Sequence, residues 1–86
     1  MEDKLYNIRV IDRQSFITFL NLLREDYLNN KNDWENSDMA SFLEALSAYA
    51  QNLQGYYNNN RGQKIDADLP SWQAFADILL GAKIYE

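Results

Sequence analysis

Acidic side chains are concentrated where the chain runs from residue 25 to residue 38, namely Glu25, Asp26, Asp33, Glu35 and Asp38. Only Arg24 and Lys31 offset this charge nearby. Paired carboxylates can exchange protons in catalysis, but only where burial separates their pKa values. This stretch is the most hydrophilic in the chain, so we expect no acid–base catalysis. A solvated surface and a docking surface for a basic partner both remain open.

The spacing of oxygen-bearing side chains in this stretch also resembles that of a helix–loop–helix calcium site. Asp33, Glu35, Ser37, Ser41 and Glu44 match the ligand spacing. The sharp turn of such a loop requires glycine where this chain has Asp38, and the long Glu35 replaces a short side chain. We therefore interpret these residues as a capped helix start and predict no metal ion and no cofactor.

Two residue types are missing altogether, which excludes several classes of function. Without cysteine, neither a disulfide nor a thiolate metal site is possible, and without histidine the commonest general base is absent. The net charge of −5 disfavours nucleic acid and anionic lipid as partners. No signal peptide and no apolar run of about 20 residues is present. We expect a cytoplasmic, non-enzymatic protein that binds neither nucleic acid nor a membrane.

Hydrophobic periodicity predicts an all-α fold, in which residues 1–86 form one domain. Helices are expected near residues 13–29, 38–54 and 70–84, capped at Asp12 or Ser15, at Ser37 or Asp38, and with Pro70 in the first turn. Gly55 suits the position just after the second helix. We expect a three-helix bundle whose core is centred on Phe16, Phe19, Phe42, Leu46, Trp72, Phe75 and Leu79.

Two segments lack a clear helical pattern. Residues 56–68 contain consecutive asparagines and Gly62, which predicts a surface loop. Residues 1–11 follow neither the helical nor the strand period over enough positions to decide between them, and no second strand follows that could pair with them. We expect them to form a short arm or turn laid across the helices.

Several short motifs resemble those of a family of small, uncharacterised bacterial domains. They are Trp34-Glu35-Asn36, Phe42 to Leu46, Ser71-Trp72 with Phe75-Ala76, and Ala82 with Tyr85-Glu86. The resemblance implies a stand-alone all-α domain of bacterial origin and carries no activity. A fainter similarity to barstar-type ribonuclease inhibitors rests on residues 43–46 and the preceding acidic loop. The parallel strands of those inhibitors have no counterpart here, which leaves an analogy between acidic helices that block basic sites.

These observations favour a small acidic protein-interaction module, for instance an immunity or inhibitor protein for a basic partner. The predicted binding residues are Asp33, Trp34, Glu35, Asp38, Glu44, Tyr56 and Tyr57. Trp34 can either pack on Phe42 as a hydrophobic staple or project as an interface anchor. The alternative is a self-associating subunit, monomeric or homodimeric, that buries a second apolar face made of Ile17, Leu22, Ile78, Leu80 and Ile84.

Overall fold

A computed structural model describes residues 4–60 and 66–85, and within these ranges the chain is helical without any strand. The elements are α1 (Lys4–Asn7), α2 (Arg13–Asn29), a 3₁₀ turn η1 (Lys31–Asp33), α3 (Met39–Gln51), α4 (Leu53–Asn60) and α5 (Trp72–Ala82). The predicted all-α class is confirmed. The predicted N-terminal arm or turn is the short helix α1, whose Leu5 is buried.

The N-termini of α2, α3 and α5 are each fixed by a side-chain cap. Asp12 Oδ1 accepts a hydrogen bond from the backbone N–H of Ser15 at 2.8 Å, and the Ser15 hydroxyl accepts one from the N–H of Asp12 at 3.1 Å. At the start of α3, Asp38 Oδ1 accepts a hydrogen bond from the backbone N–H of Ser41 at 2.8 Å, and at the start of α5 the Ser71 hydroxyl accepts one from the N–H of Ala74 at 3.0 Å. These caps satisfy backbone donors that have no partner within the helix, so local sequence sets where each helix begins.

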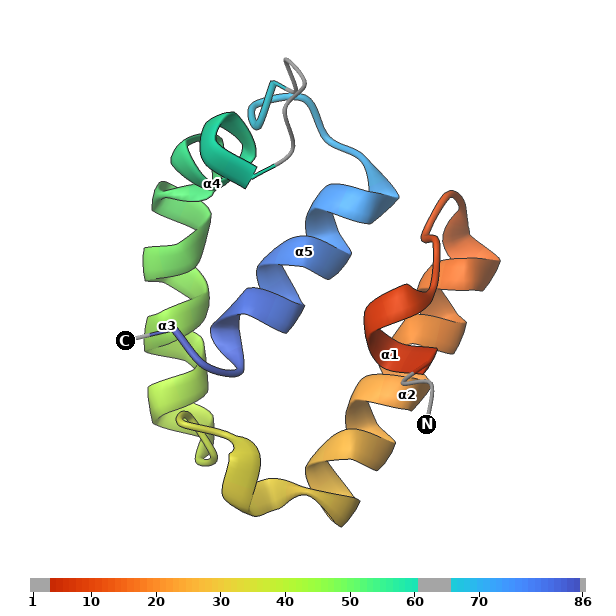
Figure 1. The fold of residues 1–86 in the computed structure, drawn as a ribbon, viewed down its shortest axis with the longest axis vertical. Helices are drawn as coiled ribbons and strands as arrows, with labels where there is room; N and C mark the ends of the chain where they lie inside the picture. Colours follow the sequence, from red (N-terminus) through yellow and green to blue (C-terminus); the bar gives the residue numbers. More distant parts are fainter. Residues whose placement is uncertain (1–3, 61–65, 86) are drawn as a thin grey trace.

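Helix α5 lies between α2 and α3 (Figure 1), and it contacts both, whereas α2 and α3 make little direct contact. The short α1 packs on α2. The main core joins these elements and consists of Leu5, Val10, Phe19, Leu23, Trp34 and Ala76. Phe42 of α3 and Leu79 and Leu80 of α5 pack against this core, so the long helices share it.

The predicted loop over residues 56–68 is wrong in its first part, because residues 56–60 belong to α4. The predicted second helix ends at Gln51, and Gly55 lies inside α4 instead of ending a helix. Tyr57 explains the error: its ring is 2% exposed and packs in a second cluster with Leu53 and Ala74. That burial outweighs the poor helix propensity of the asparagines. Residues 61–65 lie outside the described residues.

The predicted third helix, 70–84, is shorter than expected because Ser71 caps it and α5 ends at Ala82. Its aromatic residues were also misplaced, since Trp72 is 36% exposed and Phe75 is 43% exposed. Both rings pack on Phe16, with centroids 5.4 and 6.4 Å away. Helix α5 buries its small residues Ala74, Ala76 and Ala82 instead. A helix between two others leaves room mainly for small side chains on its inner faces.

The remaining residues predicted for the core centre are buried to different degrees. Phe19 is almost fully buried, as predicted. Half-buried positions are taken by Phe16, Phe42, Leu46 and Leu79. Helical spacing therefore identified the apolar sides of the helices, but the packing of α5 decided which side chains are fully enclosed.

Candidate functional site

The acidic residues predicted to bind a partner lie at the surface along η1 and the start of α3. Asp33, Glu35, Asp38 and Glu44 are all exposed. Hydrogen bonds from the backbone N–H and the hydroxyl of Ser41 lower the pKa of Asp38, so this carboxylate stays charged while it caps α3. We call these four exposed residues, Asp33, Glu35, Asp38 and Glu44, the acidic edge.

Exposed apolar side chains stand directly beside this acidic edge. Met39 is 71% exposed and Leu43 is 53% exposed. They are four positions apart on α3 and therefore lie on the same side of the helix. Their neighbours in the sequence, Asp38 and Glu44, bring negative charge to the ends of this apolar strip. Large exposed apolar residues rimmed by charge are typical of protein-binding surfaces.

An apolar groove of about 590 Å³ runs between α2 and the start of α3. Its apolar lining comes from Leu20, Leu23 and Tyr27 of α2 and from Met39 and Phe42 of α3. The polar residues that border it include Arg24, Lys31 and Asp38. We call it the α2–α3 groove. It joins the exposed strip of α3 to a hollow that an apolar side chain of a partner can fill.

Trp34 forms part of the wall of this groove and is buried, so it does not project as the exposed interface anchor that was one of its two predicted roles. Its ring lies 5.0 Å from the ring of Tyr27 and 5.9 Å from that of Phe42, measured between centroids. Its indole N–H donates a hydrogen bond of 2.8 Å to Asp26 Oδ2. The alternative interpretation, a hydrophobic staple on Phe42, is confirmed.

A buried ion pair between Asp26 and Lys83 was missed by sequence reasoning. Their charged groups are 2.8 Å apart, and the two side chains are only 11% and 6% exposed. Burial alone opposes ionisation of both groups, but hydrogen bonds to Asp26 from Lys83, Trp34 and Asn30 lower its pKa below the usual 3.8. In Lys83, bonding to Asp26 and Tyr6 outweighs burial and raises the pKa above 10.5. Both groups are therefore charged at neutral pH and form a structural ion pair.

Asn36 fastens the end of α5 to the segment before α3. Its side-chain amide donates to the carbonyls of Ala82 and Tyr85 at 2.9 and 2.7 Å. Its backbone N–H donates to the carbonyl of Lys83 at 3.2 Å. Trp34, Asn36, Ala82 and Tyr85 are the residues that carried the W-E-N and A-x-x-Y-E resemblance. These motifs therefore hold the fold together.

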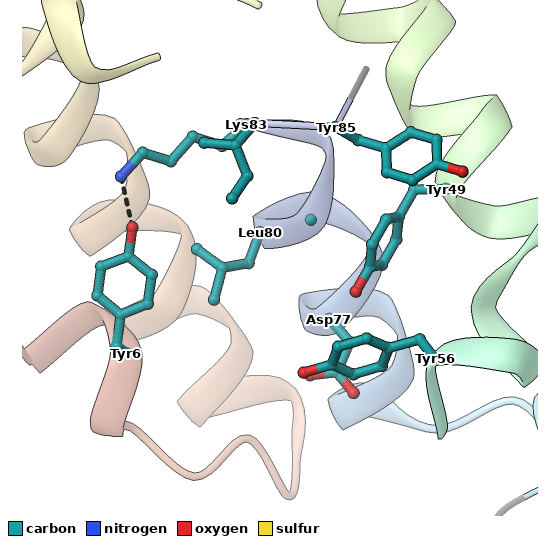
Figure 2. Close-up of a pocket in the computed structure, with 9 residues that line it drawn as sticks. Tyr6, Tyr49, Tyr56, Asp77, Leu80, Lys83 and Tyr85 are labelled. Carbon is teal, nitrogen blue, oxygen red and sulfur yellow. Dashed lines mark hydrogen bonds between the residues drawn. The ribbon is translucent and has the colours of Figure 1, made fainter. Parts of the chain in front are cut away.

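A second groove lies beside Gly81 of α5, and we call it the tyrosine groove. Figure 2 shows Tyr49, Tyr56 and Tyr85 gathered on one side of it, with Asp77 next to Tyr56, and Tyr6 and Lys83 on the other side. Its volume is about 580 Å³. It shares no lining residue with the α2–α3 groove, so Tyr56 and the acidic edge do not form one site.

Tyr57 was predicted to be an exposed aromatic contact, and this is wrong. Its hydroxyl donates a 2.8 Å hydrogen bond to Asp77 Oδ2, while the ring fills the second cluster. The other carboxylate oxygen of Asp77 accepts a bond from Gln73 Nε2 at 3.0 Å. Tyr57 therefore helps to fix the orientation of Asp77, which lines the tyrosine groove. Tyr57 lies four positions after Leu53 and therefore on the same helical face, but this signal applies only once residues 53–60 are recognised as a helix.

Within residues 4–60 and 66–85, no three acidic side chains are grouped so that they could hold a metal ion. In the same ranges no helix is long and apolar enough to cross a lipid bilayer.

Comparison with known proteins places the chain in a family without providing a function. Neither a curated protein nor a solved structure shows significant similarity to it. A family model does match residues 12–86, which include all of the helices from α2 onward and the motifs at Asn36 and Tyr85 that join their ends. The chain therefore belongs to DUF7660, a family of unknown function.

Proposed function

We propose that this domain is a protein-interaction module that binds a basic partner through the acidic edge and the neighbouring α2–α3 groove. The observation that carries the proposal is the exposure of Met39 and Leu43 between the carboxylates of Asp38 and Glu44. Such a surface complements a partner that presents apolar side chains surrounded by lysine or arginine. Burial of the apolar strip would supply affinity, and the charges would select the partner.

The most concrete version of the proposal is an immunity or inhibitor protein for a basic toxin, acting in the bacterial cytoplasm. A net charge of −5 on 86 residues attracts a basic protein over distances of about a Debye length. An acidic edge that covers a basic active site would exclude an anionic substrate by occupying its place. The absence of cysteine is compatible with a reducing compartment.

The homodimer alternative receives less support from the packing. Leu22 and Leu80 pack against the main core and Ile78 against the second cluster. This leaves Ile17 and Ile84 as the exposed members of the predicted second face. Two copies that met through the acidic edge would also place like charges together, which opposes association.

Matched substitutions can test the proposal. The tagged protein would be used to capture partners from a native lysate of the source organism, with Glu44→Lys compared with Asp68→Lys and Leu43→Ser compared with Leu69→Ser. All four positions are exposed, and each pair makes the same chemical change inside and outside the proposed surface. We expect the changes at Glu44 and Leu43 to abolish specific capture, and rising salt to release the wild-type partner.

The controls at Asp68 and Leu69 should capture the partner as the wild type does. Equal capture by all four variants would show that the acidic edge is not the binding surface. Light scattering over a range of concentrations tests the homodimer alternative, because the average molecular mass of a self-associating protein would rise with concentration.

A further inference from the structure

We infer that the partner binds in the α2–α3 groove through one amphipathic helix, with acidic side chains along one flank of its apolar face and basic side chains along the other. This rests on the proposed function, because it specifies which segment of the partner the same surface binds. A partner that is basic as a whole is not sufficient, since the bound helix must carry opposite charges on its two flanks.

The inner surface of the groove is apolar, although polar side chains contribute to it. The hydroxyl of Tyr27 donates a 2.6 Å hydrogen bond to the carbonyl of Ser37. The indole N–H of Trp34 donates to Asp26, and the side-chain amide of Asn36 donates to carbonyls at and after the end of α5. Because these donors are used within the fold, the groove presents mainly ring faces and alkyl groups. It therefore favours apolar side chains over a polar small molecule.

The backbone of the bound segment must also satisfy its hydrogen bonds. Within residues 4–60 and 66–85 the chain has no strand, so an extended partner segment would find no sheet edge there with which to pair. A helix satisfies its own backbone, and its apolar face can pack between two other helices. The groove has such walls, with Leu20 of α2 on one side and Met39 of α3 on the other, both exposed.

Opposite charges border the two sides of the groove. Arg24 and Lys31 border it from α2 and η1, whereas Asp38 borders it at the start of α3. In the part of the chain that the structure describes, Arg24 and Lys31 belong to no ion pair. A helix with acidic side chains toward α2 and basic side chains toward α3 complements both borders.

The wall of the groove on the side of α2 is held in place before a partner binds. Trp34 packs against both Tyr27 and Phe42. The ammonium group of Lys31 lies 5.3 Å from the ring centroid of Tyr27, and this cation–π contact keeps its charge beside the groove. A preorganised surface loses little conformational entropy on binding.

The experiment measures the binding of three synthetic helical peptides that share one apolar face of leucines and differ only in the charges along its flanks. The mixed peptide has lysines on one flank and glutamates on the other, the second peptide has lysines on both flanks, and the third has glutamates on both. The titrations would be made at about 0.15 M salt, which screens the net charge of the protein beyond about 8 Å.

Binding would be followed by NMR through the indole N–H signal of Trp34, which lines the groove, with Trp72 outside the groove as the internal reference. We expect saturable shifts of the Trp34 signal. The mixed peptide should bind about five- to tenfold more tightly than either of the other two, because only this peptide opposes both borders with unlike charge.

A charge exchange then tests which residues set this preference. In Arg24→Glu combined with Lys31→Glu, both borders are acidic, so the all-lysine peptide should bind best. Arg9→Glu combined with Arg13→Glu makes the same change in net charge at exposed positions outside the groove, and it should keep the preference for the mixed peptide.

A second matched pair tests the apolar contact. Leu20 and Ile17 are both 38% exposed on α2, but only Leu20 lines the groove. Leu20→Ser should weaken binding of the mixed peptide by about tenfold or more, and Ile17→Ser should leave it unchanged. Far-UV circular dichroism confirms that each variant is folded, and this pair still provides the test if the charge exchange unfolds the protein.

Four outcomes would overturn the inference. They are the absence of saturable Trp34 shifts with every peptide, binding of the all-lysine peptide to the wild type at least as tight as that of the mixed peptide, equal affinity in Leu20→Ser and Ile17→Ser, and a concentration-dependent rise in molecular mass that Leu20→Ser abolishes. The last result would assign the groove to a second copy of the chain.

A failure of this inference is distinguishable from a failure of the proposed function. If Leu43→Ser and Glu44→Lys abolish partner capture but no peptide binds, the docking surface is supported and the bound helix is refuted. If the peptides bind as expected but all the capture variants behave alike, the acidic edge is refuted and the groove is still a helix-binding site.

Discussion

A methyl group at Gly81 tests how closely Tyr49 of α3 packs on α5. A Cβ atom at this position would lie within 3.0 Å of three ring atoms of Tyr49, a separation that real Cβ atoms essentially never show. The ring cannot move freely, because Tyr56 and Tyr85 lie 5.8 and 5.3 Å away between centroids. Overpacking of this kind costs about 1–3 kcal/mol of folding free energy.

Gly55 provides the matched control for this substitution. It also lies inside a helix, but a Cβ atom there meets nothing within 4 Å. Both Gly→Ala changes gain helix propensity, worth up to about 1 kcal/mol. The stability difference between the two variants therefore isolates the steric term, and we expect Gly55→Ala to be the more stable by about 1–3 kcal/mol.

Urea unfolding followed by far-UV circular dichroism measures this difference. In a Tyr49→Ala background the overlap disappears, so Gly81→Ala should then stabilise the protein about as much as Gly55→Ala does. If the two alanine variants unfold at the same urea concentration in the wild-type background, Tyr49 does not pack on α5 as described, and the reasoning is refuted.

Three further predictions concern the core, the Asp26–Lys83 ion pair and the cap of α3. Phe19→Ala removes a fully buried ring and should lower the free energy of unfolding by about 3–5 kcal/mol. Trp72→Ala removes a partly exposed ring and should lower it by about 1–3 kcal/mol. The reverse order in urea melts would contradict the packing of α5. Lys83→Met leaves Asp26 charged and buried, which should cost about 3 kcal/mol at neutral pH. The lowered pKa of Asp26 stabilises the wild type only while this carboxylate is ionised. The difference in stability between the wild type and Lys83→Met should therefore narrow as the pH falls below the usual value of 3.8. A constant difference in pH-dependent melts would argue against the Asp26–Lys83 ion pair. Asp38→Ala removes the cap of α3 and should lower the urea midpoint by less than Phe19→Ala does, while a loss as large as that of Phe19→Ala would show that Asp38 does more than cap a helix.

The parts of the fold that sequence predicted are those governed by local chemistry. The boundaries of α2 agree with the prediction because Asp12 caps it and the asparagines from Asn29 onward end it. The start of α3 was predicted for the same reason, at Asp38. In each case the residues that decide the boundary are neighbours along the chain.

The parts that sequence missed depend on contacts between distant segments. The charge of Asp26 gave no sign that Lys83 would pair with it, since Asp26 resembles an ordinary surface residue of α2 and Lys83 one that follows the end of α5. Tyr57 is buried because Ala74 of α5 packs against it, and a window around residues 56–60 contains no trace of that contact. The exposure of the acidic edge, in contrast, could be predicted, because charged and hydrophilic residues usually lie at the surface.

The position of α5 between α2 and α3 has a consequence for how the chain folds. Helices that follow each other in a simple bundle can pair as a local hairpin, but here α2 and α3 meet mainly through a helix that is synthesised after both. Tyr6 and Lys83, which are hydrogen-bonded in the folded protein, are separated by 77 positions in the sequence. Closing so large a loop costs conformational entropy before the core contacts that offset this cost have formed, and this slows folding. We expect a nascent chain that lacks α5 to expose the apolar sides of α2 and α3, and thus to depend on chaperones until α5 arrives.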